Sequence, residues 1–222
     1  MFHANNDFAL SRLAWLDEVI CDITKWTWRD IEGEGGGTTN SGDNSPEAVK
    51  REAANVSELS TRWPNITGAI HDDIWHIINH YNYAPERYAE IYNALKSQNP
   101  ALKLWAVVYE YELNPDDWVG YEPFMDVITL WVWKSENLRN LDEYIARCHE
   151  KFPGKPLVMG CYLREYELAR GVPMEMIKLQ WETLLRHAQA GTVDGYSILG
   201  MTELELHQEQ ANWIRDFIAA NS

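Results

Sequence analysis

Two adjacent carboxyl groups, Asp72 and Asp73, end an apolar run in the sequence. The run, residues 66–70, consists of small and β-branched residues and suits a buried β-strand. Adjacent acids are costly in an apolar interior unless they are paired, protonated or used in chemistry. We therefore predict that Asp72 and Asp73 form the floor of a cleft at a strand end. An alternative interpretation is that they cap a helix or lie in a loop just past the strand, where Asp is common.

Further acids follow two other apolar segments. Glu110 and Glu112 lie at the end of the segment 102–111 and just after it, and Glu165 follows the segment 157–163. Glycoside hydrolysis uses two carboxyl groups on either side of a glycosidic bond, one protonated as general acid and the other ionised as nucleophile or base. The candidate catalytic residues are therefore Asp72, Asp73, Glu110 and Glu165.

The aromatic composition favours a ligand that is polar and has an apolar face. Eleven tryptophans and eleven tyrosines stand against five phenylalanines, and both favoured types carry a polar group. Trp26 and Trp28 share one face of a strand, as do Trp131 and Trp133, so each pair could form a stacking platform for sugar rings. The alternative interpretation is that these rings fill the core. The predicted substrate-binding residues are Trp26, Trp28, His71, Trp75, Glu112, Trp131, Trp133 and Tyr162.

Charge and cysteine content exclude several other classes of protein. With 34 acidic and 19 basic residues, the net charge of −15 disfavours nucleic acid and anionic membranes as partners. No apolar run is long enough to span a membrane, and the N-terminus does not resemble a signal peptide, which predicts a cytoplasmic protein. The cysteines, Cys21, Cys148 and Cys161, are few, widely spaced and predicted to be core residues. We expect a sugar or oligosaccharide as partner and no cofactor.

Two alternative functions remain open. His71, Asp73 and His76, with His80 nearby, include two histidines spaced i, i+4 and could belong to a metal-dependent hydrolase, although no complete ligand motif is present. A carbohydrate-binding protein without catalysis would keep the tryptophan platforms and would need no carboxylates.

The rest of the chain alternates strands with helices six times. Strands are predicted at 18–28, 66–72, 102–111, 125–133, 157–163 and 193–199, helices at 46–59, 85–95, 137–152, 174–190 and 204–219, and a short helical linker at 115–121. Residues 76–83 are predicted as a loop, and the Gly-rich residues 32–45 as a mobile loop. Such alternation predicts an α/β fold with parallel strands, either a doubly wound sheet or a TIM-barrel-like (β/α)n arrangement.

We favour the barrel-like fold, built as a single domain over residues 1–222, because acids and tryptophans follow several different strands. A complete barrel has eight βα units, whereas about six are recognisable, so the barrel is predicted to be incomplete. An exposed sheet edge would follow, through which two copies could form a homodimer.

The sequence resembles the (β/α)8-barrel glycoside hydrolases, and within them an uncharacterised bacterial group. The resemblance covers roughly residues 16–218 and is clearest in the stretches 63–73, 130–133 and 160–166. In the large retaining clan of these enzymes, the acid/base ends the fourth strand and the nucleophile the seventh. The resemblance therefore implies that Asp72 or Asp73 is the acid and Glu165 the nucleophile. The sequence departs from the clan in having Asp-Asp where Asn-Glu is usual, and in lacking the first two strands.

Overall fold

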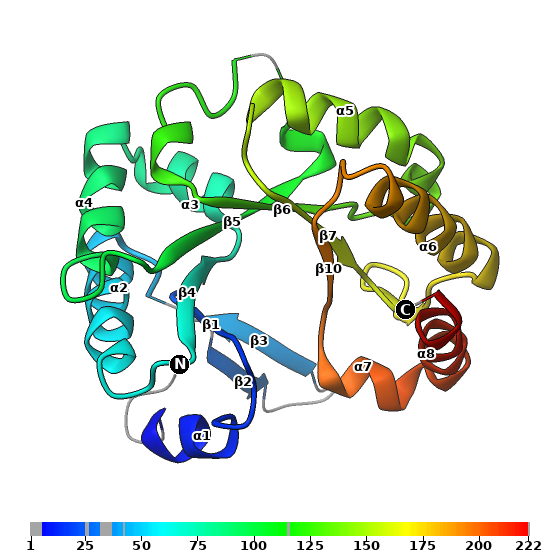
Figure 1. The fold of residues 1–222 in the computed structure, drawn as a ribbon, viewed down its shortest axis with the longest axis horizontal. Coiled ribbons are helices and arrows are strands. Elements are labelled where there is room, and N and C mark those ends of the chain that lie inside the picture. Colours follow the sequence, from blue (N-terminus) through cyan, green and yellow to red (C-terminus); the bar gives the residue numbers. More distant parts are fainter. Residues whose placement is uncertain (1–5, 25–26, 32–36, 42, 115, 222) are drawn as a thin grey trace. The chain divides into compact units, whose positions relative to one another are not determined.

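The computed structural model describes residues 6–24, 27–31, 37–41, 43–114 and 116–221. The chain divides into two compact units, and the single domain expected from the sequence stays a prediction. The first unit extends to Val107 and also includes Trp118–Val127, and the second comprises Val108–Asp117 and the chain from Ile128 onward. Figure 1 labels the α-helices and most of the strands of both units.

Six strands form one sheet in the order in which they occur along the chain (Figure 1). The order is β1 (Val19–Asp22), β4 (Ile66–His71), β5 (Lys103–Tyr109), β6 (Val127–Trp131), β7 (Leu157–Cys161) and β10 (Gly195–Ile198). The β1–β4, β4–β5, β6–β7 and β7–β10 pairs are parallel. Strands in chain order are typical of successive βα units of a TIM barrel, whereas a doubly wound sheet reverses its order at a switch point. The predicted α/β, incomplete TIM-barrel-like fold class is therefore confirmed.

In the first unit, helices follow the strands closely. Its other elements are α1 (Asn6–Arg12), the antiparallel pair β2 (Thr27–Ile31) and β3 (Gly37–Ser41), α2 (Pro46–Ser60), α3 (Ile74–Tyr81), α4 (Pro85–Leu95) and η3 (Glu122–Phe124). Helix α2 begins where predicted: the Ser45 hydroxyl accepts a hydrogen bond from the Ala48 N–H (3.4 Å), and Pro46 occupies the first turn. Helix α2 packs against α4 and against β4. The predicted helices at 46–59 and 85–95 are thus confirmed.

In the second unit, strands β6 and β7 are buried along their whole length, as expected for parallel strands covered on both faces. The other elements are η2 (Glu110–Glu112), η4 (Ser135–Asn140), α5 (Leu141–Lys151), the short pair β8 (Arg164–Glu165) and β9 (Arg170–Gly171), α6 (Met174–Gln189), α7 (Met201–Leu206) and α8 (Gln208–Asn221). Helix α6 lies beside α8, with Trp181 of α6 edge-on to Phe217 of α8. In the described part of the chain, no helix is both long and apolar enough to cross a membrane.

Four predicted segments differ from the structure. The helix predicted at 204–219 is divided at His207 into α7 and α8. The strand predicted at 18–28 ends at Asp22, and residues 27–31 form the separate strand β2. The Gly-rich segment 32–45, predicted as a loop, contains strand β3, while residues 32–36 and 42 lie outside the described residues. The prediction of a loop at 76–83 is wrong, because α3 runs to Tyr81. The apolar residues of α3, such as Ile74 and Ile77, have helical spacing, which the histidines and asparagines between them obscured.

Candidate functional site

Asp72 and Asp73 lie at the carboxyl end of β4, as the sequence predicted. They form the whole connection between this strand and α3. Asp73 has a left-handed backbone conformation (φ 48°), which Asp adopts more readily than most residues. The N–H of Asp73 donates a hydrogen bond to Oδ1 of Asp72 (2.9 Å), and both side chains are half-buried. The turn therefore holds two adjacent carboxyl groups at the strand end.

A third carboxyl group, Asp22, lies at the end of the neighbouring strand β1, where it pairs with Ile70 of β4. The buried residue Thr24 connects the two strand ends. Its N–H donates to Oδ1 of Asp22 (2.7 Å), and its hydroxyl accepts from the N–H of Asp72 (2.9 Å) and donates to the carbonyl oxygen of Asp72 (3.1 Å). Asp22 was not predicted as a site residue, because the predicted strand continued past it. The Asp-x-Thr spacing, which is typical of an Asx-turn, could have marked the strand end.

The surroundings of these acids change their protonation. Burial, followed by the charges of Asp73 and Asp22, raises the pKa of Asp72 to about 7. Burial also raises the pKa of Asp22 to about 6, although the hydrogen bonds from Thr24 act in the opposite direction. Near neutral pH, Asp72 therefore carries a proton in a large fraction of molecules. A protonated carboxyl group with such a pKa is what general acid catalysis requires.

The raised pKa of Asp72 predicts a pH-dependent effect of Asp72→Asn on stability. The folded state keeps the Asp72 proton up to about pH 7, whereas the unfolded chain loses it near the ordinary value of 3.8. The free energy of unfolding contributed by this group therefore falls as pH rises between these values. We expect Asp72→Asn to gain stability over the parent on going from about pH 4 to about pH 8, measured by urea unfolding.

Asp142 provides a control of opposite sign for this measurement. Hydrogen bonds from Arg186 and His187 lower the pKa of Asp142, so its ionised form stabilises the fold at high pH. We expect Asp142→Asn to lose stability relative to the parent as pH rises through the acid range below about 4, and to keep a nearly constant offset from it between about pH 4 and about pH 8. Equal behaviour of the two variants would contradict the assignment of a raised pKa to Asp72.

His71, predicted to contact substrate, is instead a core residue. Its side chain is 0% exposed and stacks on Tyr88, with Nδ1 3.2 Å from the Tyr88 hydroxyl. Burial lowers the pKa of His71 to about 3, so the imidazole is neutral. A side chain without exposed surface cannot touch a substrate in this conformation, and we leave His71 out of the proposed site.

The alternative metal site is not formed. His76 and His80 stack on each other along α3, with ring centroids 6.2 Å apart, while His71 is buried against Tyr88. Within the described ranges, no three His, Cys, Asp or Glu side chains lie together in a way that could hold a metal ion. The spacing of the histidines in the sequence therefore reflects one face of a helix.

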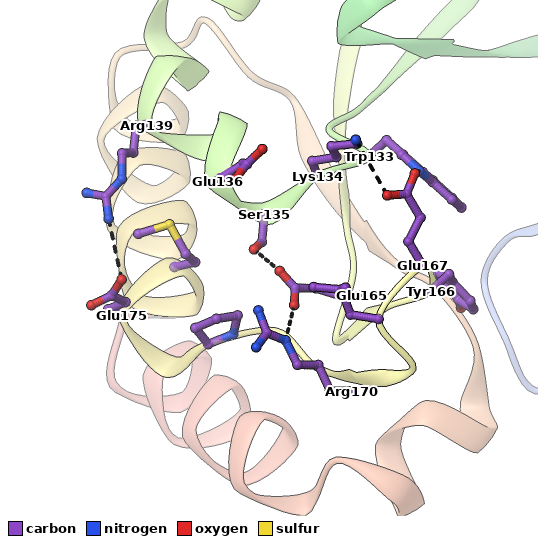
Figure 2. A pocket seen from close by; sticks show the side chains of 13 residues that line it. Trp133, Lys134, Ser135, Glu136, Arg139, Glu165, Tyr166, Glu167, Arg170 and Glu175 are labelled. Carbon is purple, nitrogen blue, oxygen red and sulfur yellow. Dashed lines mark hydrogen bonds and ion pairs between the residues drawn. The ribbon is translucent and has the colours of Figure 1, made fainter.

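The second unit contains a pocket of about 260 Å³, lined mainly by residues that follow β6 and β7 and by the start of α6 (Figure 2). Figure 2 shows three ion pairs around it, each of which places a cation opposite a carboxylate: Lys134 with Glu167 (3.5 Å), Arg139 with Glu175 (3.4 Å) and Arg170 with Glu165. The pocket therefore offers hydrogen-bond donors and acceptors side by side. Such a lining suits a neutral polar ligand better than a strongly charged one.

Glu165 is the predicted catalytic residue that lies in this pocket. The hydroxyl of Ser135 donates to one oxygen of Glu165, and the guanidinium of Arg170 donates to the other (Figure 2). Burial acts to raise the pKa of Glu165, but the hydrogen bonds from Ser135 and Arg170 outweigh it and hold the pKa below its usual value. Glu165 is therefore ionised at neutral pH. Ser135 and Arg170 were not predicted from the sequence. Arg170 reaches Glu165 only through the β8–β9 pair.

Aromatic side chains border the same pocket. The ring of Trp133 stacks on Tyr166 (centroids 5.8 Å apart, interplanar angle 11°) and meets Tyr162 edge-on at 5.8 Å. The indole N–H of Trp133 donates to Glu167 (2.9 Å), and 37% of Tyr166 is exposed. Trp133 and Tyr166 thus offer an aromatic surface beside carboxylates. Tyr162 is largely buried behind them.

Trp131 belongs to the core, in agreement with the alternative interpretation of the tryptophan pairs. It is 5% exposed, its indole N–H donates to the Thr129 hydroxyl (3.2 Å), and its ring lies against Gly160 of the neighbouring strand. A Cβ added at Gly160 would come within 1.9 Å of the ring. Trp131 and Trp133 therefore have different roles, although they are only two residues apart.

Glu110 and Glu112 hold the backbone at the end of β5. Glu110 is 4% exposed and accepts hydrogen bonds from the N–H of Trp133 (3.0 Å) and the side-chain amide of Asn137 (2.9 Å), one on each oxygen. Glu112 is 5% exposed and accepts from the N–H of Tyr109 (2.9 Å). Because these contacts are structural, we leave both acids out of the proposed site, contrary to the sequence-based prediction.

The remaining predicted binding residues are tryptophans of the first unit. Trp75 of α3 is half-buried and packs on Trp118, with ring centroids 4.8 Å apart. Trp26 and the side chain of Trp28 lie outside the described part of the chain. The first unit thus brings Asp72 and Asp73 together with Asp22, and the second brings Glu165 together with Trp133.

Comparison with known proteins gives only distant similarities. No protein-family profile matches the chain, and no curated protein does so significantly. Among solved structures, a family 18 chitinase from Crocus vernus superposes with a TM-score of 0.45 at 11% identity, over 90% of this chain and 86% of the chitinase. The catalytic core of xylanase A gives 0.46 at 9% identity, over 72% and 61% of the two chains. A Bacteroides uniformis beta-glucuronidase gives 0.45 at 12% identity, over 69% of this chain and 21% of the glucuronidase. At this level, no activity follows from the similarities.

Proposed function

We propose that the protein hydrolyses a glycosidic bond and that Asp72 is the general acid. The observation that carries this proposal is the half-buried Asp72 carboxyl group at the end of a parallel strand, whose pKa of about 7 leaves it protonated near neutral pH. Carboxyl ends of strands are where the active sites of barrel enzymes lie. An acid of this kind can donate a proton to the leaving oxygen of a glycoside as the bond from that oxygen to the anomeric carbon breaks.

Hydrolysis also needs an ionised carboxylate, which either activates water or attacks the anomeric carbon. The water that enters supplies a hydroxyl group to the anomeric carbon, and its remaining proton restores the acid. Within the first unit, the candidate for this role is Asp73, which is adjacent to Asp72 in the turn before α3. The role of Glu165 as nucleophile stays a prediction from the sequence.

Carbohydrate is the substrate class that the second unit's pocket suits best. Trp133 and Tyr166 offer aromatic faces, and the paired charges of Glu165 with Arg170 and Glu167 with Lys134 offer hydrogen-bonding partners for hydroxyl groups. Sugar rings have an apolar face and a rim of hydroxyls, which match these two kinds of surface. The net charge of −15 adds a preference for neutral rather than anionic sugars.

The test is hydrolysis of a panel of aryl and alkyl glycosides of neutral sugars across pH. We expect turnover of at least one sugar, with kcat/KM falling as pH rises through about 7, because Asp72 loses its proton there. The fall should be steepest for alkyl glycosides, since poor leaving groups depend most on protonation. Absence of turnover across the panel, or activity that keeps rising above this pH, would contradict the proposal.

A carbohydrate-binding function without catalysis is the second candidate. Ser135 and Arg170 donate hydrogen bonds to the two oxygens of Glu165, an arrangement that is common for carboxylates with a structural role. This arrangement favours a binding function without catalysis. Binding without hydrolysis, unchanged in Asp72→Asn and weakened in Trp133→Ala, would favour this candidate over a hydrolase. Soluble oligosaccharides of the same neutral sugars serve as the probes.

A further inference from the structure

The Thr24 side chain takes the place of backbone hydrogen bonds between β1 and β4 at the point where the two strands stop pairing. The regular backbone bonds continue to the Ile23 N–H, which donates to the Ile70 carbonyl oxygen (3.0 Å). One residue further, the Thr24 hydroxyl takes over both polar groups of the Asp72 backbone (2.9 and 3.1 Å). Thr24 is 3% exposed, so water cannot easily replace these bonds. A single side chain therefore fixes the backbone that carries Asp72.

The same residue also holds the carboxyl group of Asp22. The Thr24 N–H donates to Oδ1 of Asp22 at 2.7 Å. Thr24 thus contacts Asp22 through its backbone and Asp72 through its hydroxyl, although the two acids are 50 positions apart in the sequence. Movement of Thr24 would change the positions of both acids at once.

We propose that Thr24 and Asp22 are positioning residues, which together keep the carboxyl group of Asp72 protonated and in place for the reaction. This inference rests on the proposed role of Asp72 as general acid. Asp22 acts through its negative charge, which opposes ionisation of Asp72, and Thr24 acts by holding the two strand ends in register. Neither residue needs to touch the substrate.

The charged groups that act on Asp72 come from two directions. Asp22 faces it from β1, and Asp73 faces it from the start of α3. His71, the preceding residue, is neutral and buried against Tyr88. Because both charged neighbours are acidic, removal of either charge makes ionisation of Asp72 easier.

The experiment is a titration of the Asp72 carboxyl carbon by NMR in the full chain, with Asp72→Asn used to assign its signal. In Asp22→Asn, we expect the midpoint of Asp72 to fall by about 0.5 to 1 pH unit, because one like charge is removed. In Thr24→Val, which lacks the hydroxyl that holds the Asp72 backbone, the strand ends should separate and let water reach the carboxyl group, so the midpoint should fall. Thr24→Ser keeps the hydroxyl and should restore the parent midpoint. The alkaline limb of kcat/KM should shift with the midpoint in each variant.

Asp43→Asn is the matched control. Asp43 accepts from the N–H of the residue two positions later, Ser45 (3.2 Å), as Asp22 does from Thr24, but it lies before α2. Its replacement should leave the Asp72 midpoint unchanged. If Thr24→Val fails to fold, Asp22→Asn and Thr24→Ser still decide the question. An unchanged midpoint in Asp22→Asn, or a midpoint in Thr24→Ser clearly below that of the parent, would overturn the inference.

The titration separates this inference from the proposed function. The midpoint of Asp72 is measured without substrate, so coupling to Asp22 can be present in a protein that hydrolyses no glycoside. In that case the proposed function fails and the coupling stands. If turnover depends on Asp72 but its titration midpoint is unchanged by substitution of Asp22 and Thr24, the proposed function stands and the coupling fails.

Discussion

Asp72→Asn is expected to lower kcat for alkyl glycosides by about 10²- to 10⁴-fold, which is the usual contribution of a positioned general acid. The amide keeps the shape of the side chain and an oxygen for the N–H of Asp73, but it cannot donate the carboxyl proton. Aryl glycosides with good leaving groups should lose much less activity, because their leaving oxygen needs little protonation. The measurement is kcat and kcat/KM for a matched aryl and alkyl pair of the same sugar.

A second variant shows whether such a loss is specific. Asp216→Asn changes an exposed acid of α8, which pairs only with its neighbour Arg215 among the ion pairs of the described residues, and it should leave kcat unchanged. The alkaline limb of the pH profile should also disappear in Asp72→Asn. Equal losses for good and poor leaving groups would mean that Asp72 affects binding or folding and is not the general acid.

Gly160→Ala is expected to cause the largest loss of stability among conservative substitutions in the second unit. The new Cβ would lie 1.9–2.3 Å from three atoms of the Trp131 ring, which is closer than packed atoms ever approach. Trp131 cannot easily move away, because its N–H is bonded to Thr129 and its ring packs on Tyr162 at 4.9 Å. Overpacking of this kind costs about 1–3 kcal/mol in the free energy of unfolding, measured by urea unfolding.

Gly195→Ala is the control for this substitution. Gly195 lies in β10, next to Val158 of β7, and a Cβ there would meet no atom within 4 Å. We expect its free energy of unfolding to stay within about 0.5 kcal/mol of the parent. Similar losses for both glycines would show that the effect comes from the strand backbone rather than from the Trp131 ring.

The sequence was sufficient to predict features that depend on local chemistry. The Ser45–Pro46 start of α2 follows from capping, and the apolar run before Asp72 follows from the requirements of a buried strand. The chain order of the strands could also be inferred, since short βα connections allow few other arrangements. For these reasons the fold class and the position of Asp72 at a strand end were predicted correctly.

The partners of the predicted residues could not be inferred from the sequence. The link from Thr24 to Asp72 joins residues 48 positions apart, and the link from Glu110 to Trp133 joins residues 23 apart. Neither leaves a periodic pattern in the sequence. Glu110 and Glu165 look alike as acids after strands, yet Glu110 is bonded to backbone and amide groups while Glu165 faces a pocket. Burial and hydrogen bonding decide between such roles, and both depend on tertiary structure.

The left-handed turn at Asp73 limits how these two acids can be exchanged in a mutant library. Position 73 favours Gly, Asn or Asp, because a side chain branched at Cβ clashes with the backbone at a φ of 48°. Position 72 has no positive φ, so substitutions there change mainly the chemistry of the side chain, whereas most substitutions at position 73 also add backbone strain of about 1–2 kcal/mol. Redesign of this strand end is therefore best confined to position 72 and to the residues that surround its side chain.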